Sequence, residues 1–232
     1  MNHDEFIKAL KAMNIGIQEK MLEQLEKYYE LLVEWNQKMN LTAITDKKDV
    51  YLKHFYDSLT LCKVINLKEE ESLCDIGTGA GFPGIVLKIC FPHLKLTLVD
   101  SLNKRLVFLA EVVKTLKLDN VEIVHARAEE YAKKNRDKFD VVTARAVAPL
   151  NILLEYCIPL LKKGKYFIAL KGHEDITLYQ KAMGKVFVKI EKVEVFNLPI
   201  ENSIRTIIKI KKEKSTPDKY PRKYSEIKKS PL

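Results

Sequence analysis

From residue 73 onward, short apolar segments alternate with longer amphipathic ones. The short runs are rich in Val, Ile, Leu and Phe, which is typical of buried β-strands. The segments between them carry apolar residues at the three- and four-residue spacing of helices. The predicted strands are residues 73–76, 96–99, 121–124, 139–143 and 166–170, and the predicted helices are residues 83–91, 104–116, 129–134, 150–161 and 175–183. This alternation predicts a doubly wound parallel sheet of the α/β class.

The alternation stops after residue 183. Residues 186–196 and 204–210 are two strand-like runs, and the segment that joins them has no helical pattern. We therefore expect an antiparallel pair that closes the sheet. A dinucleotide-binding sheet would instead continue with further crossover units.

Residues 1 to about 65 are predicted to be helical throughout. One long helix carries an apolar stripe with the spacing of core packing, formed by Met21, Leu25, Tyr28, Leu32, Trp35 and Met39. Residues 40–46 interrupt the pattern, and Thr45 or Asp46 can cap the helix that follows. A charged linker, residues 66–72, then leads to the first strand.

Length and composition are those of a folded protein. With 232 residues, of which 47% are hydrophobic and 31% charged, the chain suits one α/β domain or one domain with an appendage. The cysteines at positions 62, 74, 90 and 157 form no CxxC pair, so we expect buried thiols of a reducing compartment and no metal site. No run approaches the about 20 apolar residues of a membrane span. We expect a cytoplasmic protein.

The formal net charge of +9 is concentrated at the C-terminus. Residues 209–232 contain nine Lys or Arg and three Asp or Glu, so +6 of the +9 lies there, with tyrosines and prolines between the charges. Such a tail can be a solvated segment that keeps the protein soluble. It can also be an arm that binds phosphates, with tyrosines available to stack on bases.

A glycine-rich segment follows the first predicted strand directly. Residues 75–84 read Asp-Ile-Gly-Thr-Gly-Ala-Gly-Phe-Pro-Gly. Glycine allows a sharp turn and a close approach of a ligand, and proline is favoured in the first turn of a helix. A strand, a tight loop and a helix N-terminus in this order hold nucleotide-like cofactors. Residues 79–84 match G-x-G-x-x-G, but this match alone does not identify the cofactor.

The acidic residues near this loop bear on the choice of cofactor. Asp75 is unfavourable beside a pyrophosphate, which brings two negative charges, and favourable beside the ammonium and sulfonium of S-adenosylmethionine (AdoMet). The electrostatics therefore favour the methyl donor. Asp100, at the end of the second predicted strand, can accept hydrogen bonds from ribose hydroxyls or cap the helix that starts near Asn103. A nicotinamide cofactor would also use an acid there.

Two further candidate residues follow the third predicted strand. The backbone amide of Ala128 and the carboxylate of Glu129 can hydrogen-bond the edge of an adenine. Glu129 equally suits the first turn of a helix, where an acid is favoured by the helix dipole. Both interpretations stay open on the sequence.

The segment around the end of the fourth predicted strand, residues 140–149, contains Arg145 and carries no acid–base constellation. It has neither the Asn/Asp-Pro-Pro-aromatic motif used for exocyclic amines nor the Pro-Cys nucleophile used for pyrimidine C5. Guanine N7 has an exposed lone pair and needs no deprotonation, so proximity and in-line orientation suffice for methyl transfer. Arg145 is the candidate catalytic residue. The lack of an acid–base constellation also fits methyl acceptors other than guanine N7. His54 and Lys171 are each either structural or functional, Lys171 as a phosphate contact.

Several segments together resemble the bacterial RsmG (GidB) family. They are Trp35-Asn36 through Thr42, the segment from His54 to Leu59, and residues 75–84, 127–129, 145–148 and 170–172. Members of this family are AdoMet-dependent methyltransferases that modify N7 of one guanine in 16S ribosomal RNA, near the decoding centre.

The resemblance implies the fold and the partner. It implies a class I AdoMet-dependent methyltransferase fold, with a helical cap (residues 1–65), a Rossmann-like domain (66–211) and a basic tail (212–232). It also implies that the partner is 16S ribosomal RNA, in the small ribosomal subunit or its assembly intermediate. We expect no membrane partner and a monomer.

The resemblance also implies site residues. Gly77, Phe82, Ala128, Glu129 and Arg145 would form the cofactor pocket, and the electrostatic argument adds Asp75 and Asp100. Gly79 and Gly81 belong to the same glycine loop. RNA contact would involve Lys171 and, in the tail, Arg222 and Lys223. The family often has an arginine-and-glycine version of this part of the tail, where this chain reads Arg-Lys-Tyr-Ser.

Two competing functions remain to be tested. A nicotinamide-dependent oxidoreductase would explain G-x-G-x-x-G and Asp100, but neither Asp75 nor the basic tail. An RNA-binding module that has lost its activity would keep the pocket without using it.

Overall fold

Seven strands form one sheet in the order β3-β2-β1-β4-β5-β7-β6 in the computed structural model, which describes residues 1–232. The strands are β1 (Ser72–Ile76), β2 (Lys95–Asp100), β3 (Val121–His125), β4 (Phe139–Arg145), β5 (Leu161–Lys171), β6 (Val188–Asn197) and β7 (Ile204–Lys212). Strands β1 to β5 pair in parallel, and β7 pairs antiparallel with both β5 and β6. The predicted mostly parallel sheet with an antiparallel closing pair is confirmed.

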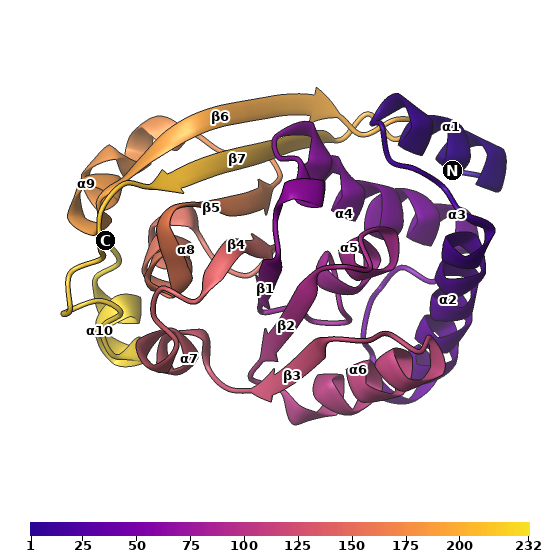
Figure 1. Cartoon of the computed structure of the whole chain (residues 1–232), viewed down its shortest axis with the longest axis horizontal. Helices are drawn as coiled ribbons and strands as arrows, with labels where there is room; N and C mark the ends of the chain where they lie inside the picture. Colours follow the sequence, from indigo (N-terminus) through magenta and orange to yellow (C-terminus); the bar gives the residue numbers. More distant parts are fainter.

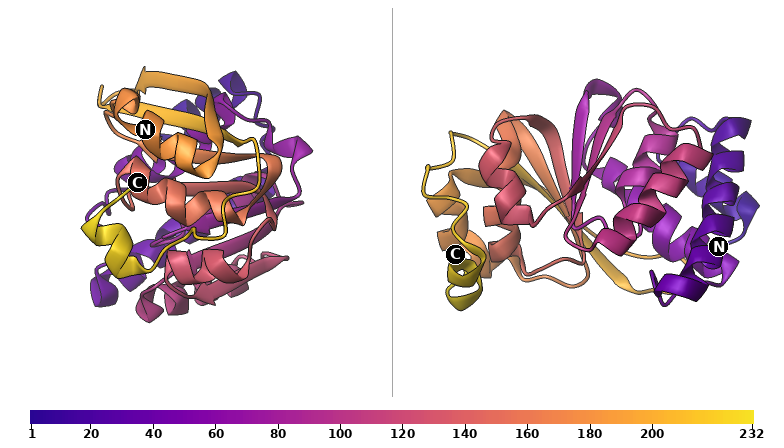
Figure 2. Two further views of the ribbon diagram at one scale, coloured as in Figure 1. Left: turned by 90° about the vertical axis from the view of Figure 1, so that its left-hand side faces the viewer. Right: turned by 90° about the horizontal axis from the view of Figure 1, so that it is seen from below.

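Helices cover both faces of the sheet (Figure 2). The α-helices are α1 (His3–Ala12), α2 (Glu19–Met39), α3 (Lys47–Val50), α4 (Asp57–Leu59), α5 (Gly84–Cys90), α6 (Asn103–Thr115), α7 (Ala128–Lys134), α8 (Leu150–Cys157), α9 (Gln180–Val186) and α10 (Tyr224–Lys229). A π-helical segment, η1 (Tyr51–Tyr56), and short 3-10 turns, η2 (Thr60–Lys63), η3 (Leu67–Glu69), η4 (Ile158–Leu160) and η5 (Ile176–Tyr179), complete the set. The N-terminal helices, α5 and α6 lie on one side, and α7 to α10 lie on the other (Figure 1).

The N-terminal helices share one hydrophobic core with the sheet. The centre of the predicted stripe on α2 is buried at Leu25, Tyr28 and Leu32, where the helix packs on α5 and α6. The Tyr28 hydroxyl donates a hydrogen bond to the carbonyl of Ala80 in the glycine loop. Asp46 caps α3, as predicted, by accepting from the Asp49 amide. The helical cap therefore supports the glycine loop directly.

The helical cap is interrupted twice. The break predicted at residues 40–46 is confirmed, where the left-handed backbone of Asn40 (φ 50°) ends α2, whereas the break at residues 13–18 was not predicted. Between Tyr51 and Tyr56 the chain winds as a π-helix, and five of its six residues are buried. A π-turn packs one more residue into each turn than an α-helix, and such turns are frequent at functional sites. This segment carries His54, and Asp57 follows it directly.

Further differences concern the C-terminal half. The predicted helix 150–161 ends earlier, because Leu161 already belongs to β5. The predicted helix 175–183 is a 3-10 turn followed by α9. The predicted start of the tail, residue 212, is the last residue of β7. Lys212 is buried there, and its Nζ donates to Asp137 Oδ1 (2.7 Å) and the Leu161 carbonyl (2.7 Å).

The C-terminal segment, residues 213–232, folds back onto the α7–α8 side of the sheet (Figure 1). Tyr220 and Ile227 are buried in the hydrophobic core on that side. The Arg136 guanidinium donates to the carbonyls of Thr216 and Tyr220. The segment is thus part of the folded protein, which differs from a solvated tail. No helix of the structure has both the length and the apolar character needed to cross a membrane.

Replacing Gly81 by alanine should destabilise the fold more than the same change at Gly164. Both glycines have positive φ (98° and 83°), so both substitutions strain the backbone. A Cβ at Gly81 would lie 2.6 Å from the Tyr28 hydroxyl and 2.7 Å from Ile85 Cγ1, whereas nothing lies within 4 Å at Gly164. We expect Gly81→Ala to cost about 2 kcal/mol more, measured by denaturant unfolding. Equal losses would contradict this account of the packing.

Candidate cofactor and acceptor site

The glycine loop connects β1 to α5 and is closed by Asp75. Asp75 Oδ2 accepts hydrogen bonds from the Thr78 hydroxyl (2.7 Å) and the Gly84 amide (2.9 Å). Gly77, Gly79 and Gly81 all have positive φ, which other residues adopt only with strain. Asp75 therefore fixes the shape of the loop from inside the protein.

Asp75 is fully buried and only half satisfied. Its Oδ1 has no hydrogen-bond partner, and the side chain is 0% exposed. Burial raises the pKa of this carboxyl to about 7, although the bonds from Thr78 and Gly84 act in the opposite direction. Asp75 lies behind the loop and does not line the hollow described next. Its direct contact with a cofactor thus remains a prediction.

A hollow of about 400 Å³ opens at the carboxyl ends of β1, β2 and β3. Four of the predicted cofactor residues line it, namely Gly77, Asp100, Ala128 and Glu129. Residues that the sequence did not single out complete the wall, among them Arg105, Arg127, Val147, Tyr156 and Tyr224. In open α/β sheets this edge, at the point where the strand order reverses, is where ligands bind. Here the order reverses between β1 and β4.

Gly77 lies directly under the segment that follows β4. A Cβ on Gly77 would come within 2.6 Å of Val147 Cγ2. The preceding residue, Ala146, has φ 56°, an uncommon conformation for a residue with a side chain. Glycine at position 77 thus lets the Val147 segment pack closely against the loop, and any side chain there would have to displace Val147.

Asp100 both shapes the loop and faces the hollow. Its Oδ2 accepts from the Gly79 amide (3.0 Å) and from Arg105 Nη1 (3.1 Å), and its Oδ1 accepts from the Leu102 amide (2.9 Å). A carboxylate oxygen accepts about two hydrogen bonds, so Oδ1 retains one free position. Asp100 does not cap α6, whose N-cap residue is Leu102 and has no side-chain cap, and the free position on its Oδ1 is one that a ribose hydroxyl can use.

Ala128 and Glu129, the residues predicted to hydrogen-bond an adenine, are the first two residues of α7. Glu129 is buried, and this burial raises the pKa of its carboxyl. The ring of Tyr156 lines the same end of the hollow, and burial raises the pKa of its hydroxyl to about 12. Two tyrosines, Tyr156 and Tyr224, thus lie at this end of the hollow beside the polar groups of Arg127 and Glu129, which suits a flat apolar ring with polar edges.

Arg145 lies on the other side of Ala146, in a cluster that joins three parts of the chain. Its Nη1 donates to Asp57 Oδ2 (2.9 Å) and to the Lys53 carbonyl (3.1 Å). Asp57 Oδ1 accepts in addition from Arg205 Nε (3.0 Å). One buried carboxylate thus orients two guanidinium groups, from β4 and β7, against the helical cap.

Phe82 and His54 lie against this cluster. The Arg145 guanidinium lies 5.2 Å from the centroid of the Phe82 ring, and the His54 ring stacks on the same ring at 4.5 Å. Burial and the Arg145 charge lower the pKa of His54 to about 3, so the imidazole is neutral at physiological pH. His54 Nδ1 lies between Arg145 Nη2 (3.3 Å), a donor, and the Lys53 carbonyl (3.2 Å), an acceptor, and Nε2 faces Thr42 Oγ1 at 2.9 Å.

A second hollow, of about 330 Å³, opens beside this cluster and shares Ala146 with the first. Its charged lining consists of Lys53, Asp57, Arg145, Lys171 and Arg205, four cations and one carboxylate. Lys171 donates to the Ala148 carbonyl (2.9 Å) and faces Glu174 at 3.4 Å. Lys53 is also paired, with Asp49 and Glu201 at 3.3 Å each, so an anionic ligand such as the phosphate of a nucleotide would compete with carboxylates for these cations.

Other predicted residues lie away from both hollows. Gly79, Gly81 and Phe82 shape and support the loop, and none of the three lines either hollow. Arg222 is not a free cation, because its guanidinium is paired with Glu155 in two hydrogen bonds of 2.7 and 2.8 Å. Glu155 is 0% exposed, so this arginine neutralises a buried charge. Lys223 is exposed.

The sequence assigned no role to Asp57 or Arg205, and it suggested Tyr224 only as one of the tail tyrosines that can stack on the bases of RNA. Asp57 stands in a segment that carries the family resemblance, and this was the one available signal. Arg205 and Tyr224 reach the site only through folding, from β7 and from α10. No local pattern marks either residue as part of the site.

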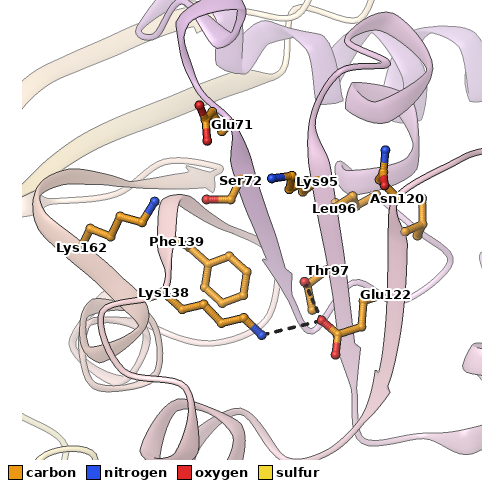
Figure 3. Close-up of a pocket in the computed structure, with 11 residues that line it drawn as sticks. Glu71, Ser72, Lys95, Leu96, Thr97, Asn120, Glu122, Lys138, Phe139 and Lys162 are labelled. Carbon is orange, nitrogen blue, oxygen red and sulfur yellow. Dashed lines mark hydrogen bonds and ion pairs between the residues drawn. The ribbon is translucent and has the colours of Figure 1, made fainter.

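A further hollow, of about 460 Å³, lies at the amino ends of the strands, away from the glycine loop (Figure 3). Lys95, Lys138, Lys162, Glu71 and Glu122 line it, so charges of both signs are mixed. Lys138 pairs with Glu122 at 3.8 Å, and Lys162 pairs with Asp140 at 3.0 Å. The glycine loop and Arg145 lie at the carboxyl ends of the strands, and the candidate active site is therefore assigned to that end of the sheet.

The geometry agrees with the comparison to known proteins. A sequence model of the GidB family, described as rRNA small subunit methyltransferase G, matches residues 21–207. The chain belongs to the rRNA small subunit methyltransferase G family. The matched residues run from α2 to β7 and so include the glycine loop, the Arg145 cluster and both hollows except Tyr224.

Relatives named for this family match over the whole chain. The Ribosomal RNA small subunit methyltransferase G of Bacillus velezensis is 51% identical, covering 100% of this chain and 99% of that protein. The protein of the same name from Bacillus subtilis is 48% identical with the same coverage.

Solved structures share the fold at low identity. A putative S-adenosylmethionine-dependent methyltransferase from Listeria monocytogenes superposes with a TM-score of 0.55 at 14% identity, covering 68% of this chain and 98% of that one. TYW2 of M. jannaschii, solved in complex with AdoMet, gives a TM-score of 0.54 at 18% identity, covering 67% and 74%. These likenesses confirm the predicted class I methyltransferase fold.

Asp75→Asn should change the pH dependence of stability. Between pH 3.8 and about 7 the unfolded chain ionises this carboxyl while the folded protein keeps it protonated. The folded state then holds one more proton, so this group makes the free energy of unfolding fall as the pH rises, by up to about 1.4 kcal/mol per pH unit. Denaturant titrations across this window should show that contribution in the wild type and not in the variant.

The comparison with the variant is necessary because His54 acts in the opposite direction. Its lowered pKa makes stability rise with pH between about 3 and 6.5. Subtracting the pH profile of the variant from that of the wild type cancels the contribution of His54. An identical pH profile in both would mean that Asp75 is ionised in the folded protein.

Proposed function

We propose that this protein transfers the methyl group of AdoMet to N7 of a guanine in 16S ribosomal RNA. The observation that carries the proposal is the pair of hollows that meet at Ala146. One is built on the glycine loop and suits an adenosine, and the other is cationic and suits a nucleotide. Family membership supplies the substrate class, since the relatives are named for ribosomal RNA of the small subunit.

The residues of the first hollow fit AdoMet. Gly77 offers backbone without a side chain, Asp100 offers a carboxylate oxygen to the ribose, and Ala128 with Glu129 offers an amide and a carboxyl to the adenine. Asp75 lies behind the loop and supports the loop backbone through the Gly84 amide and the Thr78 hydroxyl. When bound, AdoMet supplies an electrophilic methyl group on a sulfonium.

The second hollow would position the acceptor. Lys53, Lys171 and Arg205 can neutralise phosphates on either side of the target nucleotide. Arg145, held by Asp57 and by the Phe82 ring, presents a fixed cationic edge to the base. The guanine N7 lone pair forms the new bond to carbon while the carbon–sulfur bond breaks, and S-adenosylhomocysteine leaves. The product guanine carries the positive charge.

No residue needs to remove a proton in this reaction. Guanine N7 is unprotonated at neutral pH, and the only histidine of the cluster, His54, has a pKa lowered to about 3. A group with this pKa is a poor general base at pH 7. The contribution of the protein is therefore to bring the two reactants together in line, which can supply a large part of the rate enhancement.

The direct test is methyl transfer to small ribosomal subunits that lack the modification. The protein is incubated with AdoMet labelled in the methyl group, and the ribosomal RNA is then cleaved chemically at 7-methylguanine. Label in 16S RNA and cleavage at one guanine support the proposal. Label elsewhere in the RNA would overturn the choice of acceptor. Binding of AdoMet without any transfer would favour a binding module, and binding of NADH instead would favour an oxidoreductase.

Arg145→Lys should separate the acceptor role from a cofactor role. Lysine keeps the charge but cannot reproduce the planar contacts to Asp57 and Phe82. We expect kcat for methyl transfer to fall about 100-fold, with the Kd for AdoMet changed less than about twofold, because Arg145 lines only the second hollow. Calorimetry and single-turnover kinetics measure the two quantities. A parallel loss of AdoMet affinity would place Arg145 in the cofactor site.

Arg222 and Lys223 are a matched pair for testing RNA contact. Arg222→Ala leaves Glu155 buried without its partner and should lower the free energy of unfolding by about 3–5 kcal/mol. Lys223→Ala, at an exposed site, should leave unfolding unchanged and reduce the slope of log affinity for RNA against log salt concentration by about 1. An unchanged slope for Lys223→Ala would remove this lysine from the RNA interface.

A further inference from the structure

The C-terminal segment, residues 213–232, is anchored next to the cofactor hollow. The Arg222 amide and guanidinium both donate to Glu155, which lies on α8. Tyr156, the next residue of α8, lines the hollow. Ile227 of α10 is fully buried in the core between these elements. The ion pair and this apolar contact hold α10 in a fixed position beside the hollow.

Tyr224, the first residue of α10, reaches the wall of the hollow. It lines the hollow together with Arg127, Ala128 and Glu129, and so lies at the end assigned to the adenine. The Arg127 guanidinium lies 4.6 Å from the centroid of the Tyr224 ring, a distance at which the cation and the ring attract each other. The contact orients the aromatic ring at the mouth of the pocket.

We propose that Tyr224 is a cofactor-binding residue that closes the adenine end of the AdoMet pocket. The proposal rests on the assignment of this hollow to AdoMet. Arg127 lies over one face of the ring, and 42% of the Tyr224 surface remains exposed, so part of the ring is left free to contact a ligand. A purine placed between the α7 start and α10 covers that part of the ring, and aromatic rings stack on bases with favourable energy. The basic C-terminal segment thereby becomes part of the cofactor site.

This role differs from that of an RNA arm attached to a complete enzyme. A segment that binds RNA alone would leave AdoMet affinity unchanged when its exposed side chains are altered. Because the Tyr224 side chain is exposed and takes no part in the Arg222–Glu155 hydrogen bonds, its replacement leaves the anchoring contacts of Arg222 and Ile227 in place. Cofactor affinity can therefore be tested without unfolding the segment.

The test compares Tyr224→Ala with Phe187→Ala in the full chain. Phe187 is the matched control, because it is also an exposed aromatic residue (41%) with a lysine over its ring, at 5.8 Å, and it lines neither hollow. By calorimetry we expect Tyr224→Ala to weaken binding of AdoMet about tenfold. Tyr224→Phe, which keeps the ring, and Phe187→Ala should bind like the wild type.

A second ligand locates the contact. 5′-Methylthioadenosine retains the adenosine and lacks the amino acid end, so Tyr224→Ala should weaken its binding by the same factor as that of AdoMet. A variant that loses affinity for AdoMet only would overturn the assignment to the adenine end. Wild-type affinity of Tyr224→Ala for both ligands would overturn the proposal altogether.

These outcomes are independent of the reaction. A wild-type protein that binds AdoMet but does not methylate ribosomal RNA would contradict the proposed function and leave the role of Tyr224 open to the same measurement. Conversely, normal RNA methylation with unaltered AdoMet affinity in Tyr224→Ala would contradict only the role of Tyr224.

Discussion

A buried carboxylate between two guanidinium groups holds the functional edge of this protein together. Asp57 accepts from Arg145 at the end of β4 and from Arg205 in β7, and it belongs to the helical cap. Burying a charge is costly unless it is paired and hydrogen-bonded. A shift of the cap or of the closing strand pair would therefore leave a buried charge without its partner. This constraint fixes Arg145 over Phe82 and, through Phe82, the position of His54.

The glycine loop depends on two supports from opposite sides. Asp75 holds it from within the sheet through the Gly84 amide and the Thr78 hydroxyl. Tyr28 holds it from the helical cap through the Ala80 carbonyl. The cap and the sheet share one hydrophobic core, and the cap therefore acts as part of the cofactor site's scaffold. The helical cap therefore supports the glycine loop, although none of its own residues lines the cofactor hollow.

The strands were predictable because a parallel sheet covered on both faces needs continuous apolar runs. The π-turn at residues 51–56 was not, because apolar residues at helical spacing do not distinguish an α-turn from a wider one. The C-terminal segment was judged by its charge alone. Two cations of the predicted tail (212–232) pair with acids far away in sequence, Arg222 with Glu155 and Lys212 with Asp137, and composition does not reveal such pairs.

The sequence by itself determined the class of fold, the glycine loop and the family, because each depends on a local pattern of residues. It also located Gly77, Asp100, Ala128 and Glu129, since the ends of parallel strands meet at one edge. Only the tertiary structure decided which residues face the ligand and which support it. Asp75 turns inward, Arg222 pairs with a buried acid, and Tyr224 reaches the pocket from α10. The physical reason is that burial and charge pairing depend on contacts between distant residues.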